Sequence, residues 1–112
     1  MTQYLVAIHH PDDFDPAMES EATIRDIQAL NVEMKAAGVR LFAGGLQSAA
    51  SARSLRPQPN GEVHVTGGPY IEAKEHVGGF WILEVDTPEE ALEWGRKAAI
   101  ACRVPVEVRA FH

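Results

Sequence analysis

Apolar positions divide the chain into short strand-like runs and two longer segments of helical period. Residues 4–8 and 80–85 are nearly continuous apolar runs, which is typical of strands covered on both faces. Two shorter runs, 39–43 and 104–109, predict two further strands. The pattern therefore predicts four strands that share one core.

Residues 16–37 predict a first helix, because apolar side chains recur there every three or four residues. Gly38 follows the last turn, where a glycine commonly ends a helix. The positions expected to face the core are Ile24, Ile27, Leu30 and Met34.

A second helix is predicted to begin after Thr87, which suits the N-cap position. Pro88 fits the first helical position, and Glu89 and Glu90 favour the first turn. Small residues then recur along one stripe and would let this helix approach a sheet closely. They are Ala91, Gly95, Ala98 and Cys102.

Residues 53–56 and 62–65 flank a proline- and glycine-containing turn and could pair as a hairpin, whereas the conformation of 46–61 is otherwise open. The order of elements predicts an α+β, ferredoxin-like βαββαβ fold with an inserted β-hairpin. Right-handed crossovers place the four main strands in the order 4-1-3-2, with the third antiparallel to the first. All 112 residues, 1–112, are expected to form a single domain.

Both helices should cover one face of this sheet and leave the other face bare. Strands 4–8 and 80–85 are apolar on both sides, and an uncovered apolar face is a liability in a monomer. We therefore expect a homodimer in which two sheets pack face to face, a dimeric α/β-barrel-like assembly.

Charge and composition exclude several classes of partner. The net charge of −6 and the scattered basic residues argue against nucleic-acid binding. The one cysteine, Cys102, allows no intrachain disulfide and no paired-cysteine metal site. No apolar run approaches the roughly 20 residues of a membrane span, and the N-terminus lacks a signal-peptide pattern. We expect a cytoplasmic protein with no membrane contact, no cofactor and no bound metal.

Residues 65–81 are rich in glycine and carry a Glu-x-Lys-Glu cluster just before an apolar strand. Closely spaced glycines favour tight backbone turns, so this stretch is predicted to be an ordered loop rather than a linker. No helix follows, so the glycines do not form a phosphate-binding loop. The residues expected to shape tight turns are Gly67, Gly68, Pro69, Gly78 and Gly79.

The predicted topology brings this loop to the edge of the sheet where the first strand ends, next to His9 and His10. A rim pocket for a small organic molecule is therefore expected there. The two histidines point to opposite faces, so only one of them enters a given pocket. Beside Asp12 or Asp13, that histidine could act as a general base. The alternative is a surface histidine in a turn before Pro11.

The acidic and basic side chains of the loop allow two interpretations. An ion-pair cluster of Glu72, Lys74 and Glu75 would either position a polar ligand or pin the loop. Glu72 and His76 would meet if this stretch formed a helical turn, and Tyr70 would either cap a pocket or fill core space. The candidate catalytic residues are thus His9, His10 and Glu72. The candidate ligand-binding residues are Tyr70, Lys74, Glu75 and His76.

Residues 65–81 resemble the signature of the YCII-related (DGPF-domain) family, roughly VTDGPFAETKEQLGGF. The likeness extends through residues 89–94 and 106–109. Gly67 stands where the family usually has Asp, and Ala73 where it usually has Thr. The matching positions are Gly68, Pro69, Glu72, Lys74, Glu75, Gly78 and Gly79.

The resemblance implies muconolactone-isomerase-like αβ-barrel dimers, for some of which a His/Asp acid–base role has been proposed. Related chains also accompany extracytoplasmic-function sigma factors. Two functions follow: a ligand-binding protein with isomerase- or lyase-like acid–base chemistry, or a non-catalytic accessory or regulatory module acting through its dimer surface. If the signature Asp is catalytic in relatives, Gly67 closes that route.

Overall fold

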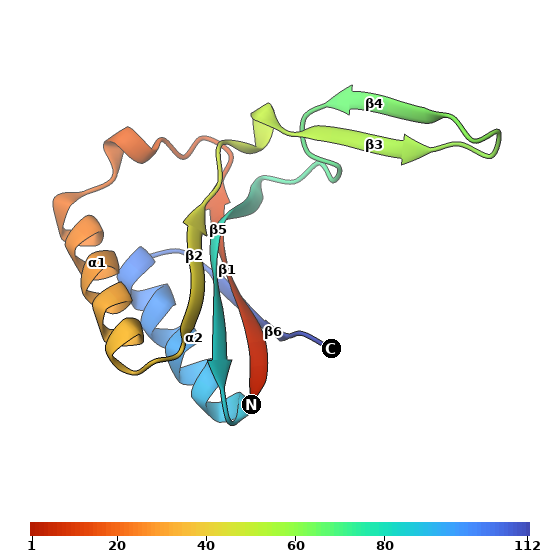
Figure 1. Cartoon of the computed structure of the whole chain (residues 1–112). Coiled ribbons are helices and arrows are strands. Elements are labelled where there is room, and N and C mark those ends of the chain that lie inside the picture. Colours follow the sequence, from red (N-terminus) through yellow and green to blue (C-terminus); the bar gives the residue numbers. More distant parts are fainter.

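A four-stranded antiparallel sheet carries two helices on one face and a projecting β-hairpin at one end (Figure 1). The computed structural model describes residues 1–112. Two 3₁₀ turns, Pro16–Met18 and Ala49–Ser51, interrupt the connections. The strands and helices are β1 (Thr2–Pro11), α1 (Glu21–Ala36), β2 (Arg40–Gly45), β3 (Arg53–Pro57), β4 (Val63–Gly67), β5 (Glu75–Val85), α2 (Pro88–Cys102) and β6 (Val106–Ala110).

The main sheet has the strand order β2-β5-β1-β6, and every neighbouring pair is antiparallel. In terms of the four main strands this is 4-1-3-2, as predicted, with the third strand antiparallel to the first. The arrangement is compatible with a ferredoxin-like fold.

The core lies between the sheet and the two helices. Alternation along β1 and β5 points every second side chain towards the helices, so Val6 and Leu83 are fully buried. From α1, Leu30 and Met34 fill the same layer. The predicted small stripe of α2 is also buried, and it packs closely enough that a Cβ on Gly95 would overlap Val108.

The first helix is shorter than predicted. It begins at Glu21, because Ser20 is its N-cap and accepts a hydrogen bond from the Thr23 amide at 3.1 Å. Ile24, expected in the core, is 43% exposed, and Thr23, four residues before Ile27 on the buried face, is buried in its place. Gly38 follows the helix with a φ of +72°, as its predicted role requires.

Strands β3 and β4 pair with each other and not with the main sheet, and they extend away from the body (Figure 1). The radius of gyration is 16.1 Å, whereas about 13 Å is usual for this length. One face of the hairpin is apolar and exposed, with Leu55 opposite Val65 and Pro57 opposite Val63. The β3–β4 hairpin therefore has an exposed apolar strip.

Neither helix has the length and the apolar content that a membrane span requires.

Candidate functional site

The end of β1 and the start of β5 meet at one edge of the sheet. His10 pairs with His76, and the Asp12 amide donates a hydrogen bond to the Lys74 carbonyl at 2.9 Å. This is the predicted meeting of the first strand with the glycine-rich loop. Strand β5 begins at Glu75, however, and not at residue 80 as predicted, because residues 75–79 continue the ladder with β1.

Two of the glycines predicted to form turns lie inside β5. Gly78 is the unpaired residue of a bulge, since Ile8 pairs with Gly79 and His9 pairs with Val77. A Cβ on Gly79 would lie 2.9 Å from the Gly44 carbonyl oxygen, so this glycine permits close pairing with β2. Of the four glycines predicted to shape the loop, only Gly68, with a φ of +91°, has the turn conformation that favours glycine.

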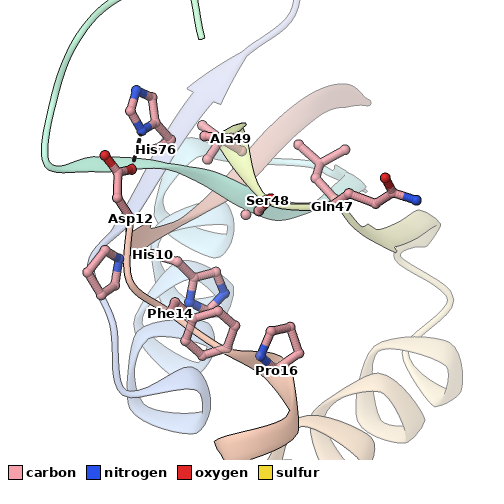
Figure 2. A pocket seen from close by; sticks show the side chains of 12 residues that line it. His10, Asp12, Phe14, Pro16, Gln47, Ser48, Ala49 and His76 are labelled. Carbon is pink, nitrogen blue, oxygen red and sulfur yellow. Dashed lines mark hydrogen bonds and ion pairs between the residues drawn. The ribbon is translucent and has the colours of Figure 1, made fainter. Parts of the chain in front are cut away.

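The imidazole of His10 is held between a glycine and an aromatic ring. Phe14 stacks on one face, with ring centroids 3.8 Å apart and an interplanar angle of 19° (Figure 2). A turn closed by the Phe14 amide and the Pro11 carbonyl brings this ring back over the strand. On its other side the imidazole contacts the backbone of Gly78, where any Cβ would overlap it. Both neighbours limit how the ring can move.

Burial also sets the charge of His10. Its Nδ1 atom is buried and has no hydrogen-bond partner. Desolvation lowers the pKa of His10, and the nearby charge of Glu19 opposes this effect without reversing it. The ring is therefore neutral at pH 7, and a neutral imidazole carries one nitrogen lone pair that can accept a proton.

His76, directly across the ladder, is in the opposite condition. Its Nδ1 lies 2.6 Å from Asp12 Oδ1 (Figure 2). Its Nε2 lies 2.8 Å from the Ile71 carbonyl oxygen. Both partners can only accept, so both bonds form together only when the ring carries two protons. The Ile71 carbonyl and then the Asp12 carboxylate raise the pKa of His76. The His76 ring therefore links the segment after β1 to the loop before β5, and neither nitrogen is available as a base.

Two hollows adjoin His10 and Gly78. The smaller, called the rim cleft, has a volume of about 60 Å³ and also contacts Asp12, Phe14 and His76 (Figure 2). The larger, called the inner cavity, has a volume of about 410 Å³ and lies between the sheet and α1. Ligand sites usually measure roughly 300–1,000 Å³, so the inner cavity has the size of a small-molecule site and the rim cleft does not.

The walls of the inner cavity are apolar with a few polar groups, which is the usual composition of a ligand site. Its lining residues come from β1, the segment before α1, the two helices, β2 and β5, and they include Cys102. Burial is the main reason that the pKa of this thiol rises to about 11, so it is not a nucleophile at neutral pH. The lining residues are Ile8, His10, Glu19, Ile27, Asn31, Arg40, Ala43, Gly44, Gly45, Gly78, Gly79, Phe80, Trp81 and Cys102.

A polar network in this cavity was not predicted from the sequence. Asn31 Oδ1 accepts hydrogen bonds from Arg40 Nη1 at 3.0 Å and from Trp81 Nε1 at 2.9 Å. Asn31 Nδ2 donates to the Ile27 carbonyl at 3.1 Å, which fixes the orientation of the amide. The available signal was the position of Asn31, four residues after Ile27 on the apolar stripe of α1. A polar side chain in such a stripe indicates a buried hydrogen-bond network.

Most of the predicted loop residues lie away from both hollows. His9 is on the opposite face from His10 and lines neither. Glu72, Lys74 and Glu75 are exposed and form no ion pair with one another, so the predicted cluster is absent. Residues 71–74 form no helical turn, so Glu72 does not meet His76.

Tyr70 neither caps a hollow nor fills the core. It is 65% exposed, and Arg56 of the hairpin lies over its ring at 4.9 Å from the centroid. Of the predicted site residues, the structure brings together His10, His76, Gly78 and Gly79 around the two hollows.

Comparison with known proteins places the chain in a family. Residues 1–108 match the YCII-related domain, so the chain belongs to the YCII-related family. It is also similar to an uncharacterized protein of Rhizobium meliloti (strain 1021), with 32% identity over 78 residues. That match covers 70% of this chain and 62% of the relative, so it spans less than two thirds of the relative's length.

Proposed function

We propose that the inner cavity binds a small organic molecule and that His10 exchanges a proton with it. The observation that carries this proposal is the environment of His10: a neutral, closely packed imidazole that lines the cavity and whose buried Nδ1 has no partner in the protein. Buried polar atoms are normally satisfied, so an unpartnered nitrogen on a ring that lines a cavity calls for a functional explanation, and proton exchange with a ligand supplies one. A neutral imidazole with a lowered pKa suits a general base.

His76 and Asp12 support the site without entering the chemistry. Both nitrogens of His76 are engaged, so this ring holds the loop end against β1 and keeps the neighbouring rung in register. The proposed chemistry therefore rests on His10 and not on the His–Asp pair. It also needs no acid at position 67, because Gly67 lies at the end of β4 and lines neither hollow.

The test uses His10→Asn with His9→Asn as the matched control, since the adjacent histidine lies on the other face of the sheet. Small neutral and anionic carbonyl compounds are incubated with the protein in D₂O, and deuterium incorporation next to the carbonyl is followed by NMR. We expect incorporation with the wild type and with His9→Asn, and its loss with His10→Asn. Incorporation that survives in His10→Asn would refute the role of His10, and so would a panel that never perturbs the His10 ring resonances.

We also propose that the chain forms a homodimer through the face of the sheet that no helix covers. Leu5 and Ala7 of β1 lie on this face, and Phe42 and Phe80 meet there with ring centroids 5.5 Å apart. Phe42 is 49% exposed in the single chain. An accessory module acting through its dimer surface would use the same face, so dimerisation is common to both proposed functions.

Analytical ultracentrifugation tests this second proposal by measuring the oligomeric state. Phe42→Glu places a charge on the bare face and is expected to convert a dimer to a monomer. Leu92→Glu is the control, because Leu92 is an apolar side chain on α2 that is at least as exposed as Phe42, at 57%. A wild-type monomer at micromolar concentration, or a dimer that Phe42→Glu leaves intact, would contradict the proposal.

A further inference from the structure

The inner cavity contains a guanidinium group without an anionic partner. Arg40 lies on the helix-facing side of β2, since it pairs with the buried Leu83, and it lines the cavity. Its one hydrogen bond is from Nη1 to the neutral Asn31 Oδ1, and no carboxylate lies within ion-pair distance. A half-buried charge is costly unless it is paired.

Asn31 orients this guanidinium and does not neutralise it. The amide is held by Trp81 Nε1 and the Ile27 carbonyl, so the Arg40 head has a fixed partner on one edge. A guanidinium has five N–H donors in a planar fork that matches a carboxylate. The remaining donors of Arg40 are thus available for one carboxylate of a ligand.

Glu19 gives the cavity an opposite charge near the other end. Its charge acts on both His10 and Cys102, which line the cavity where β1 and α2 end. A second carboxylate at this end would be repelled by Glu19. The cavity is therefore polarised, with a cation at the Arg40 end and an anion at the His10 end.

The two ends lie at different levels along β1. The Arg40 head is linked through Asn31 to the indole of Trp81, and Trp81 pairs with Val6. From Val6 to His10 the strand rises roughly 13 Å at its usual spacing. Ile8 and Ile27 line the space between.

We infer that the ligand of the inner cavity is an elongated monocarboxylate, with its carboxylate on Arg40, an apolar spacer, and an uncharged polar group at His10. This inference rests on the proposed function of the cavity and adds the chemical class of the ligand. Arg40 is a binding residue in this scheme, whereas His10 handles the proton.

Three probes of one shape test the inference by calorimetry: 3-(4-hydroxyphenyl)propionate, its amide, and 3-(4-carboxyphenyl)propionate. We expect the monocarboxylate to bind, and the amide and the dicarboxylate each to bind about tenfold more weakly or worse. Arg40→Gln should abolish the preference for acid over amide. Arg96→Gln is the control, because Arg96 pairs with Glu93 on the outside of α2. Glu19→Gln should improve binding of the dicarboxylate and serves as a second variant if Arg40→Gln does not fold.

The outcomes separate this inference from the proposed function. Acid selectivity that depends on Arg40 and persists in His10→Asn would uphold the ligand class, even if His10 transfers no proton. Equal affinity for acid and amide, or acid binding unchanged in Arg40→Gln, would overturn the ligand class while leaving proton transfer by His10 intact. Failure of all three probes to bind would overturn the inference.

Discussion

His10 and His76 face each other across one rung of the β1–β5 ladder, yet their surroundings give them opposite properties. His76 has an acceptor at each nitrogen, whereas His10 has a buried nitrogen with none. The first environment stabilises the imidazolium and the second stabilises the neutral ring. Position in a sheet thus says little about the role of a histidine, and the partners of its two nitrogens say most.

The difference arises from the backbone beyond the ladder. After His10 the chain turns, so that Phe14 covers one face of this ring, and Asp12 extends towards His76. Gly78, left unpaired by the bulge, gives His10 the space to lie flat. One short turn therefore supplies the cover for one histidine and the counter-ion for the other.

The largest expected effect is that of Gly78→Ala. The added methyl would occupy the space of the His10 imidazole, so the ring must leave its position or the strands must separate. Overpacking of this kind costs about 1–3 kcal/mol of unfolding free energy. Urea unfolding measures the cost, and the NMR shifts of the His10 ring report its displacement.

Gly67→Ala is the control for this change, because a Cβ there would have no neighbour within 4 Å and its φ is not positive. It should leave both the stability and the His10 resonances nearly unchanged. Equal effects of the two substitutions would contradict the conclusion that Gly78 provides the space for the His10 ring.

Phe14→Leu is expected to have the next largest effect, a loss of about 1 kcal/mol from the stacked pair. Water would then reach one face of His10, and its pKa should rise towards the ordinary value because desolvation is what lowers it. NMR titration of the histidine ring protons measures the shift. Phe111→Leu, which alters a half-exposed ring elsewhere, should leave the titration of His10 unchanged.

The sequence predicted the sheet and the two helices well, because long apolar runs and capping residues are local signals. Thr87 and the small stripe of α2 are clear examples, and the strand order followed from connection rules. The site was predicted only in part. The meeting of His10 with the glycine-rich loop followed from topology, whereas the partners of each ring did not.

Those partners depend on contacts that no local pattern encodes. Asp12 and His76 are 64 residues apart in the chain, and their contact requires β5 to begin five residues earlier than the apolar pattern indicates. The charges of Glu72, Lys74 and Glu75 attracted the prediction because they are clustered in sequence. In the structure their side chains are exposed, and the segment meets the end of β1 through its backbone: the Lys74 carbonyl accepts from the Asp12 amide, and Glu75 pairs with Pro11.

The two histidines should make the stability depend on pH with opposite signs. The raised pKa of His76 means that its contribution is complete below the unfolded value of about 6.5 and is lost as the pH rises through the folded pKa. The lowered pKa of His10 means that its contribution is present above about 6.5 and is lost as the pH falls through its folded pKa.

Unfolding free energies of His76→Gln and His10→Gln, measured against the wild type from pH 5 to pH 9, test these signs. The deficit of His76→Gln should be greatest at acid pH and shrink towards pH 9. The deficit of His10→Gln should be greatest at alkaline pH and shrink towards pH 5. Deficits that change in the same direction would contradict the assigned charge states.

The smallest expected effect is that of Asp12→Asn, which changes only the second of the two causes that raise the pKa of His76. The Ile71 carbonyl remains, so the pKa should fall but stay above the ordinary value, because the carbonyl still favours a protonated ring. Asp13→Asn is the matched control, since Asp13 makes no side-chain hydrogen bond or ion pair. His10, with no bond to Asp12, should titrate as before in both variants. If Asp12→Asn instead moved the His10 titration as far as that of His76, the two rings would be electrostatically coupled. His76 could then not be assigned a purely structural role and His10 the role of the base.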